Sequence, residues 1–229
     1  MKIILTQKNR LKLKSEEQKI VQQLAYHCAR LYNVGLYSVR QHFFEHKKYL
    51  NYAQNYHECK VNENYQYLLS DSAQQVLRIV DRNFKSFFGL LKAKKQGVFD
   101  HKVRVPKYKG KQDGWIIPIQ GRSVRIKGKN VVIGLSKAFR EKYQPLIKEL
   151  KLPFPKHIKT TKLQEVRILP IGNEFEIEYV YQKEVLFKKL DEKKHVSIDL
   201  GLSNLASCFD STSGSSFVID GRYIKAINQ

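Results

Sequence analysis

One carboxylate stands inside an apolar run near the end of this 229-residue sequence. Asp199 lies in the run Val196–Leu202, which reads VSIDLGL. A carboxylate in apolar surroundings costs free energy unless it is paired, and a divalent cation is a common partner, so Asp199 is a candidate metal ligand. The alternative is a structural aspartate that caps a turn before Gly201. Spacing alone favours this alternative.

A second candidate for chemistry is the basic segment from Lys92 to Lys129. It holds 12 Lys or Arg and only 2 Asp, and it also contains Tyr108, Trp115 and several glycines. Such a segment lets the backbone approach a phosphate chain while a ring is available for stacking. The alternative is a set of solvated loop cations. We predict nucleic-acid contacts for this segment and for the cationic face of the N-terminal strand: Arg10, Lys12, Lys14, Lys102, Arg104, Lys107, Tyr108, Lys109, Lys111, Arg122, Arg125, Lys127 and Lys129.

The composition supports a polyanionic partner. The chain has 42 Lys and Arg against 21 Asp and Glu, a net charge of +21. Nucleic acid is the first candidate partner, an anionic membrane surface the second and an acidic small substrate the third. With 42% hydrophobic and 11% aromatic residues the chain can bury a core, so disorder does not explain the charge.

The cysteines and the apolar runs bear on the compartment. Cys28, Cys59 and Cys208 are scattered, which argues for a reducing compartment without a disulfide framework or a zinc site. The N-terminal apolar run, residues 3–5, is far shorter than the roughly 7 to 15 residues of a signal-peptide core. We therefore predict a cytoplasmic protein with no membrane partner.

Two amphipathic helices are predicted in the first half of the chain. Residues 1–14 alternate as a strand, and Ser15 with Gln18 has the spacing of a capping box that opens a helix running to about Phe43. A polar stretch at 51–67 breaks the pattern. A second helix is predicted from about residue 70 to 91 because its apolar residues repeat every three or four positions.

After Lys95 the pattern changes to short alternating strands. We predict strands at 115–119, 123–126, 130–133, 164–169 and 174–182, with hairpin turns at Gly128 and Gly172. Residues 137–150 are predicted as a helix that Pro145 breaks or kinks. Strands at this spacing are typical of a small barrel or curled sheet, to which the N-terminal strand could return.

A charged connector at 183–194 leads to three further predicted strands, at 195–200, 205–209 and 216–219. About 35 residues cannot bury a core of their own. We expect these strands to be poorly ordered, to lean on the barrel or to need a partner.

Other candidate sites are weaker. His42 and His46 are spaced as metal ligands can be, but no third ligand is near and a solvated helix face is favoured. The sequence has no helix-turn-helix, zinc-finger or ribonucleoprotein motif and no nucleophile elbow. Binding through backbone and shape, with a steep salt dependence, is therefore expected.

Several runs together resemble a known family. Residues 197–206, SIDLGLSNLA, resemble the first RuvC motif of the TnpB proteins of bacterial insertion sequences, relatives of the type V CRISPR effectors. Upstream, the helix from Gln74-Gln75 through Phe84 to Phe87-Phe88, and then Pro106-Lys107-Tyr108-Lys109, resemble that family's double-Phe helix and its basic element. The order and spacing match along the whole chain.

The resemblance implies an α+β architecture. A wedge-type β-barrel would comprise 1–14 and 96–190, a helical recognition domain would be inserted at 15–95, and 191–229 would begin an incomplete RNase H-like (RuvC) nuclease domain. It also implies guide RNA and target DNA as partners, with the guide made from the transposon end and directing cleavage beside a short flanking motif. In that scheme base pairing reads the sequence while the protein holds the backbone.

By the same resemblance Asp199 would be the first catalytic and metal-binding carboxylate, sharing two Mg²⁺ ions. The family also needs a glutamate and a second aspartate further on, usually with a four-cysteine zinc element. After Asp199 the only acids are Asp210 and Asp220, and neither matches those motifs. We therefore expect this chain to be the N-terminal part of a longer RNA-guided endonuclease, with a possible missing C-terminal nuclease half, and to cut no DNA alone. Alternatives are a nuclease-dead RNA-guided repressor and a guide-independent RNA-binding protein.

Overall fold

The computed structural model describes residues 2–110, 114–158, 163–185, 190–191, 193–201 and 204–227. By internal contacts the chain divides into two compact units. We call residues 2–183 the first unit and residues 184–229 the C-terminal unit.

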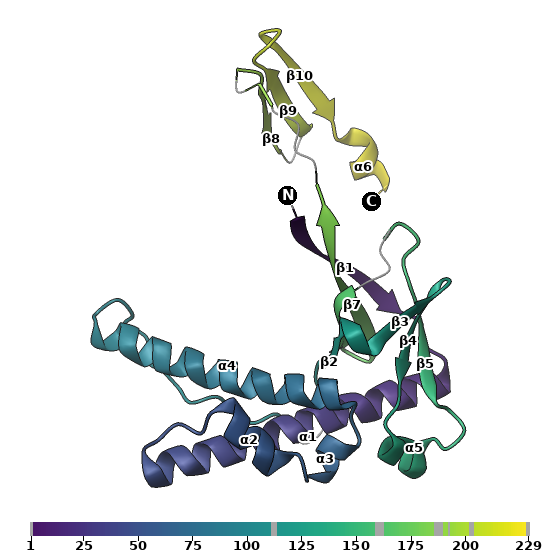
Figure 1. The fold of residues 1–229 in the computed structure, drawn as a ribbon. Helices are drawn as coiled ribbons and strands as arrows, with labels where there is room; N and C mark the ends of the chain where they lie inside the picture. The colour runs from purple at the N-terminus through teal and green to yellow at the C-terminus, as the bar shows by residue number, and fades with distance from the viewer. Residues whose placement is uncertain are drawn as a thin grey trace. The chain divides into compact units, whose positions relative to one another are not determined.

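Two long helices dominate the first unit. Helix α1 (Ser15–His46) packs against α4 (Ser70–Lys95), and Figure 1 shows the two running side by side. Both were predicted from their apolar stripes and are confirmed. The predicted cap is wrong by one residue, because the N-cap is Lys14, whose backbone N–H donates to Glu17 Oε2 at 2.8 Å. Helix α1 therefore begins at Ser15, and the side chain that accepts from the N-cap backbone N–H is the carboxylate of Glu17, not the amide of Gln18.

The polar stretch between these helices contains two short ones, α2 (Tyr52–Cys59) and α3 (Glu63–Gln66). Asn51 caps the first by accepting from Gln54 N at 3.1 Å, and Asn62 caps the second by accepting from Asn64 N at 2.9 Å. The apolar pattern does break over 51–67, but asparagine caps begin two short helices within this stretch.

A four-stranded antiparallel sheet joins the N-terminal strand to strands far along the chain. Its order is β1-β7-β6-β2, from β1 (Lys2–Leu11), β7 (Glu174–Glu184), β6 (Leu163–Ile171) and β2 (Ile117–Gln120). Lys8 Nζ lies 2.8 Å from Glu178 Oε1, so an ion pair ties β1 to β7. The predicted return of the N-terminal strand is confirmed.

A second sheet follows the short 3₁₀ helix η1 (Gly121–Ser123). It has the order β3-β4-β5, from β3 (Val124–Lys127), β4 (Asn130–Gly134) and β5 (Glu149–Pro153). The helix predicted over 137–150 and interrupted at Pro145 is confirmed for its first part only, and the prediction is wrong for the residues after Pro145. Helix α5 (Lys137–Tyr143) ends two residues before Pro145, and the chain then alternates into β5, burying Leu150 and Leu152. No ladder links the two described sheets and neither closes, so the predicted barrel is not confirmed.

One apolar core holds the helices and both sheets of the first unit together. It includes Leu31 of α1, Val80 and Phe84 of α4, Ile117 of β2 and Ile133 of β4, each no more than 2% exposed. Burying these side chains is the main favourable contribution to folding. The fold therefore fixes α1 and α4 against the sheets that follow them.

The C-terminal unit is a three-stranded antiparallel sheet, β10-β9-β8. Its strands are β8 (Val196–Asp199), β9 (Asn204–Asp210) and β10 (Ser215–Asp220), and all three were predicted. A short helix, α6 (Arg222–Ile227), follows and was not. Across the described residues of both units, no helix is both long and apolar enough to cross a membrane.

Candidate nucleic-acid interface

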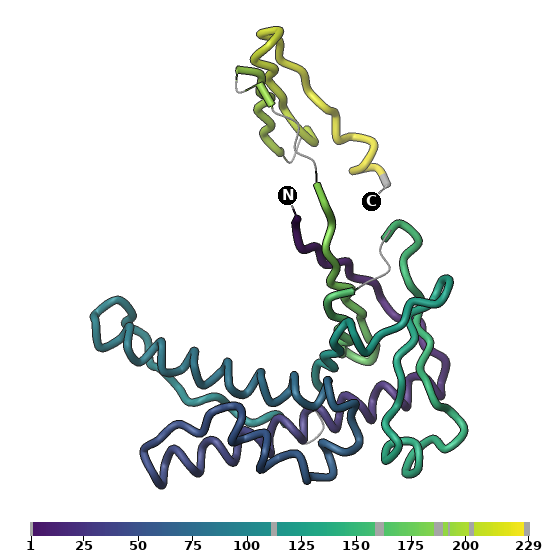
Figure 2. The backbone as a smooth tube through the Cα atoms, in the orientation of Figure 1, coloured from purple at the N-terminus to yellow at the C-terminus, as the bar shows by residue number. Residues whose placement is uncertain are grey.

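The centre of the basic segment is extended chain that runs back along the two long helices. Figure 2 shows residues 98–110 turning at the end of α4 and returning beside it and α1. Val103 and Val105 pack against the core, while Lys102, Arg104 and Lys107 are exposed. Apolar and basic residues thus alternate, and the cations point away from the protein.

Polar side chains of α1 fix the backbone of this segment. Asn33 Nδ2 donates to Lys109 O at 3.0 Å, and Lys109 N donates to Asn33 Oδ1 at 2.8 Å. One residue on, Arg30 Nη2 donates to Gly110 O. At the other end Lys94 Nζ donates to His101 O at 3.3 Å. These bonds fix the segment against α1 and, through Lys94, against the end of α4. The sequence analysis did not anticipate the contacts with α1, because Arg30 and Asn33 lie far from the segment along the chain.

The ammonium group of Lys109 lies close to two aromatic rings of the protein. Its Nζ lies 5.3 Å from the ring centroid of Tyr32 and 5.1 Å from that of Trp115, and it is half-buried. Distances of this kind mark a cation–π contact. Lys109 therefore anchors the segment, and Trp115, half-buried against the core, is packed and not displayed for stacking.

Tyr108 is the ring that the segment displays. It is 44% exposed, and Arg40 Cζ lies 4.8 Å from its ring centroid. An exposed ring beside a cation is a surface on which a base of a single-stranded nucleic acid can stack. Arg40 comes from α1, so this platform too depends on the helix.

Two predicted phosphate contacts are already neutralised. Arg122 forms a bidentate pair with Asp71, at 2.9 Å from Nε to Oδ2 and 2.5 Å from Nη2 to Oδ1. Hydrogen bonds from Arg122 hold the pKa of Asp71 below its usual value. Arg125 Nη2 lies 2.8 Å from Glu149 Oε2. Counting charge along the segment missed both acids, because they come from α4 and β5.

The remaining predicted contacts differ in their surroundings. Arg10 lies 3.7 Å from Glu174 across the β1–β7 pair, whereas Lys12 and Lys14 are exposed. Lys127 and Lys129 are exposed on either side of Gly128, whose φ of +58° makes the β3–β4 turn. Lys111 lies outside the described residues. Among the predicted cations described, those that form no ion pair and stand exposed are Lys12, Lys14, Lys102, Arg104, Lys107, Lys127 and Lys129.

Asp199 lies at the end of β8, an outer strand of the C-terminal sheet, and is exposed. Register places it beside Ser207 of β9. Among the described residues no three His, Cys, Asp or Glu side chains gather as metal ligands. Asp210 accepts from Thr212 N at 2.8 Å, and Arg222 Nε donates to Asp220 at 2.6 Å, so both later acids have partners of their own. These bonds hold the pKa of each below its usual value.

Comparison with known proteins gives a match in fold only. No family model and no curated protein matches the sequence. The fold is similar to a cryo-EM structure of Cas12f1 with its sgRNA and target DNA, at a TM-score of 0.50 and 17% identity over 99% of this chain. A CRISPR-Cas12f ternary complex follows at a TM-score of 0.45 and 14% identity over 92% of this chain. The chain spans 59% of the length of the first and 49% of the second. The α+β fold of this chain is thus similar to that of Cas12f1 in the first of these structures.

Proposed function

We propose that this chain binds a guide RNA and the DNA that pairs with it, as the N-terminal part of an RNA-guided DNA-targeting protein. One observation carries the proposal: the basic segment is an extended backbone fixed to α1 by Arg30 and Asn33, with its free cations facing outward. The similarity in fold to a protein solved with sgRNA and target DNA supports it.

The arrangement suits recognition of a backbone and not of a sequence. Lys102, Arg104 and Lys107 are separated along the chain by the half-buried residues Val103, Val105 and Pro106, so their spacing follows an extended chain. Because the backbone that carries these cations is already fixed, binding to phosphates has to order only their side chains. In RNA-guided systems base pairing supplies the sequence specificity.

The finer assignments are part of this proposal. We infer a TnpB-type, transposon-encoded protein from residues 197–206, 74–88 and 106–109. The wedge, helical insert and nuclease domain would take the ranges predicted above. A missing C-terminal nuclease half would complete the protein.

Magnesium chemistry is not assigned to the described residues. A two-metal site needs several carboxylates around one point. Asp199 is exposed without a second described acid beside it, and Asp210 and Asp220 are turned to other partners. This donor set does not fit the ion, and we expect no cleavage from this chain alone.

Co-purified RNA tests the proposal. We expect the protein purified from its native cells to carry one RNA species of defined sequence, and the loaded protein to bind duplex DNA that matches it. The repressor alternative predicts the same RNA and lasting occupancy without cleavage. If no defined RNA is recovered and the protein binds duplex DNA and RNA equally, both RNA-guided hypotheses, the endonuclease and the repressor, are wrong.

Salt dependence tests the basic segment. Replacing Lys102, Arg104 and Lys107 by Gln should lower the slope of log affinity against log salt by about 2 to 3, at roughly 0.7 to 0.9 per phosphate contact. The matched control is Arg122→Gln with Arg125→Gln, since these arginines are already paired with Asp71 and Glu149. Equal changes in the two variants would place the interface elsewhere.

Cleavage is tested with Mg²⁺, guide and matching target. We expect no products from this chain. Cleavage that disappears in Asp199→Ala would contradict the expectation and would assign Asp199 its catalytic role.

A further inference from the structure

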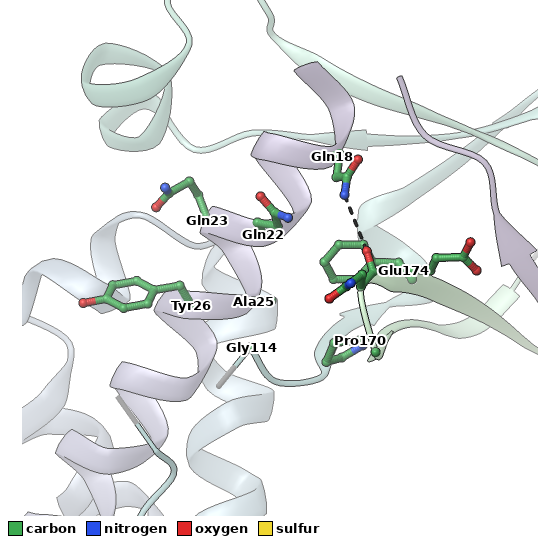
Figure 3. Close-up of a pocket in the computed structure, with 11 residues that line it drawn as sticks. Gln18, Gln22, Gln23, Ala25, Tyr26, Gly114, Pro170 and Glu174 are labelled. Atoms are coloured by element: carbon green, nitrogen blue, oxygen red, sulfur yellow. Dashed lines mark hydrogen bonds between the residues drawn. The ribbon is translucent and has the colours of Figure 1, made fainter. Parts of the chain in front are cut away.

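A cavity of about 630 Å³ lies between the N-terminal half of α1 and the β6–β7 turn. Its size falls within the roughly 300 to 1,000 Å³ of small-molecule sites. Figure 3 shows Gln22 on the side of α1 nearer to Pro170 and Glu174 of the hairpin, and Gln23 and Tyr26 extending from α1 away from the hairpin; all five residues line the cavity. All of these residues belong to the first unit.

Three glutamine amides from α1 line this cavity. Gln18 Nε2 donates to Asn173 O at 3.5 Å, which ties the helix to the turn. Gln22 and Gln23 make no hydrogen bond with the part of the chain that the structure describes. A glutamine amide offers donors and an acceptor side by side, the pattern that matches the edge of a nucleobase.

A ring stands beside these amides. Tyr26 is 42% exposed, and Arg30 Cζ lies 5.1 Å from its ring centroid. Arg30 is itself held by its hydrogen bond to Gly110 O. The same arginine thus backs the ring and ties the basic segment to α1, so the cavity lies next to the proposed path of the phosphate chain.

The lining favours a base over a phosphate. Ala25, Gly114, Pro170 and Phe175 give the cavity an apolar surface. None of the described residues lining it is Lys or Arg, and Glu174 at its edge is an acid. Among the described lining residues a phosphate would meet no cation, whereas a flat, uncharged base can stack on a ring and bond to amides.

We propose that this cavity receives one unpaired nucleobase of the bound nucleic acid, which stacks on Tyr26 and bonds through its edge to Gln22 and Gln23. The proposal rests on the proposed function, because the basic segment brings the strand to the cavity. It adds a contact that reads a base directly, where the basic segment reads only backbone.

Binding of short labelled oligonucleotides to the full chain tests this site. The probes are single-stranded RNAs of one length that differ at one base, together with a blunt duplex of the same length, all measured by anisotropy at one salt concentration. Tyr26→Ala should weaken single-strand binding about 5- to 150-fold, the range for loss of one stacked base, and leave duplex binding within about twofold. Tyr26→Phe keeps the ring and should bind as the unaltered chain does.

The amides are tested by base preference. Gln22→Ala with Gln23→Ala should bring the affinities for the four bases to within about twofold of one another. Gln41→Ala is the matched control, since Gln41 is on the same helix and does not line the cavity. Circular dichroism confirms that each variant is folded.

The outcomes separate this proposal from the proposed function. The cavity site is overturned if Tyr26→Ala weakens single-strand and duplex binding equally, or if it weakens neither. It is also overturned if the unaltered chain binds only duplex. A defined co-purified RNA in those cases leaves the proposed function standing. If Tyr26→Ala weakens only single-strand binding but no defined RNA co-purifies with the protein, the base site is supported and the proposed guide RNA is overturned.

Discussion

The two units of this chain hold the same kinds of apolar residues in opposite surroundings. In the first unit Val80, Phe84 and Ile133 are no more than 2% exposed. In the C-terminal unit Ile198 is 62% exposed and Phe217 50% exposed, and among its described apolar residues only Ala206 and Cys208 are buried. Hydrogen-bonded strands occur in both units, but among the described residues only the first unit has a buried core. A strand ladder without a packed face adds little stability of its own.

Hydrogen exchange should give the largest contrast. We expect amides of β4 and β6 to be protected at least about a thousandfold more than those of β8 and β10, since local opening of an unpacked sheet needs far less free energy than global unfolding. Exchange followed by mass spectrometry on peptides measures both units in one sample. Similar protection in the two would mean that the C-terminal strands have a packing partner.

Core truncation gives the next effect. Phe84 is fully buried beside Tyr49 and Phe88, so Phe84→Ala should lower the free energy of unfolding by about 3 to 5 kcal/mol. Ile198→Ala should change it by less than about 0.5 kcal/mol. Trp115 is the chain's one tryptophan and lies in the first unit, so its fluorescence in urea reports that unit directly. A large loss in Ile198→Ala would show that the units unfold together.

Close backbone packing in the first unit is tested at Gly121. A Cβ there would stand 1.7 Å from Leu163 O, so Gly121→Ala must move the backbone where η1 meets β6 and should destabilise by about 1 to 3 kcal/mol. Gly134→Ala is the matched control, because no atom lies within 4 Å of its added Cβ. The same urea midpoints measure both. Equal midpoints would mean that the β2–η1 junction adapts freely.

The elements that the sequence predicts are those set by local pattern. The stripes of α1 and α4 and the turns at Gly128 and Gly172 need only neighbours in sequence, and they are confirmed. Strand β5 was missed because its alternation is short and Pro145 was interpreted as a kink in a longer helix.

The site was less predictable because it depends on partners distant in sequence. The sequence predicts Arg122 and Lys109 as free cations. In the structure Arg122 pairs with Asp71, and Lys109 contacts the rings of Tyr32 and Trp115. Counting charges along one segment does not include an acidic residue that another helix or strand places beside that segment. The cavity beside Tyr26 has the same origin, since α1 and the β6–β7 turn lie about 150 residues apart, and only the fold brings them together.

The smallest expected effect compares one aspartate–arginine pair from each unit. Asp71 pairs with Arg122 and so ties α4 to η1, whereas Asp220 pairs with Arg222 only two residues away. Asp71→Asn should lower the melting temperature followed by Trp115 by about 1 to 3 °C at pH 7, while Asp220→Asn should leave it unchanged.

The pKa of Asp71 is lower in the folded state, so its stabilising contribution is full above its unfolded pKa of about 3.8 and is lost as the pH falls through the folded value. The difference between Asp71→Asn and the unaltered chain should therefore shrink below pH 3.8. A difference that stays constant there would mean that Arg122 binds Asp71 through hydrogen bonds that protonation does not weaken, and a shift in Asp220→Asn would mean that the C-terminal sheet stabilises the first unit.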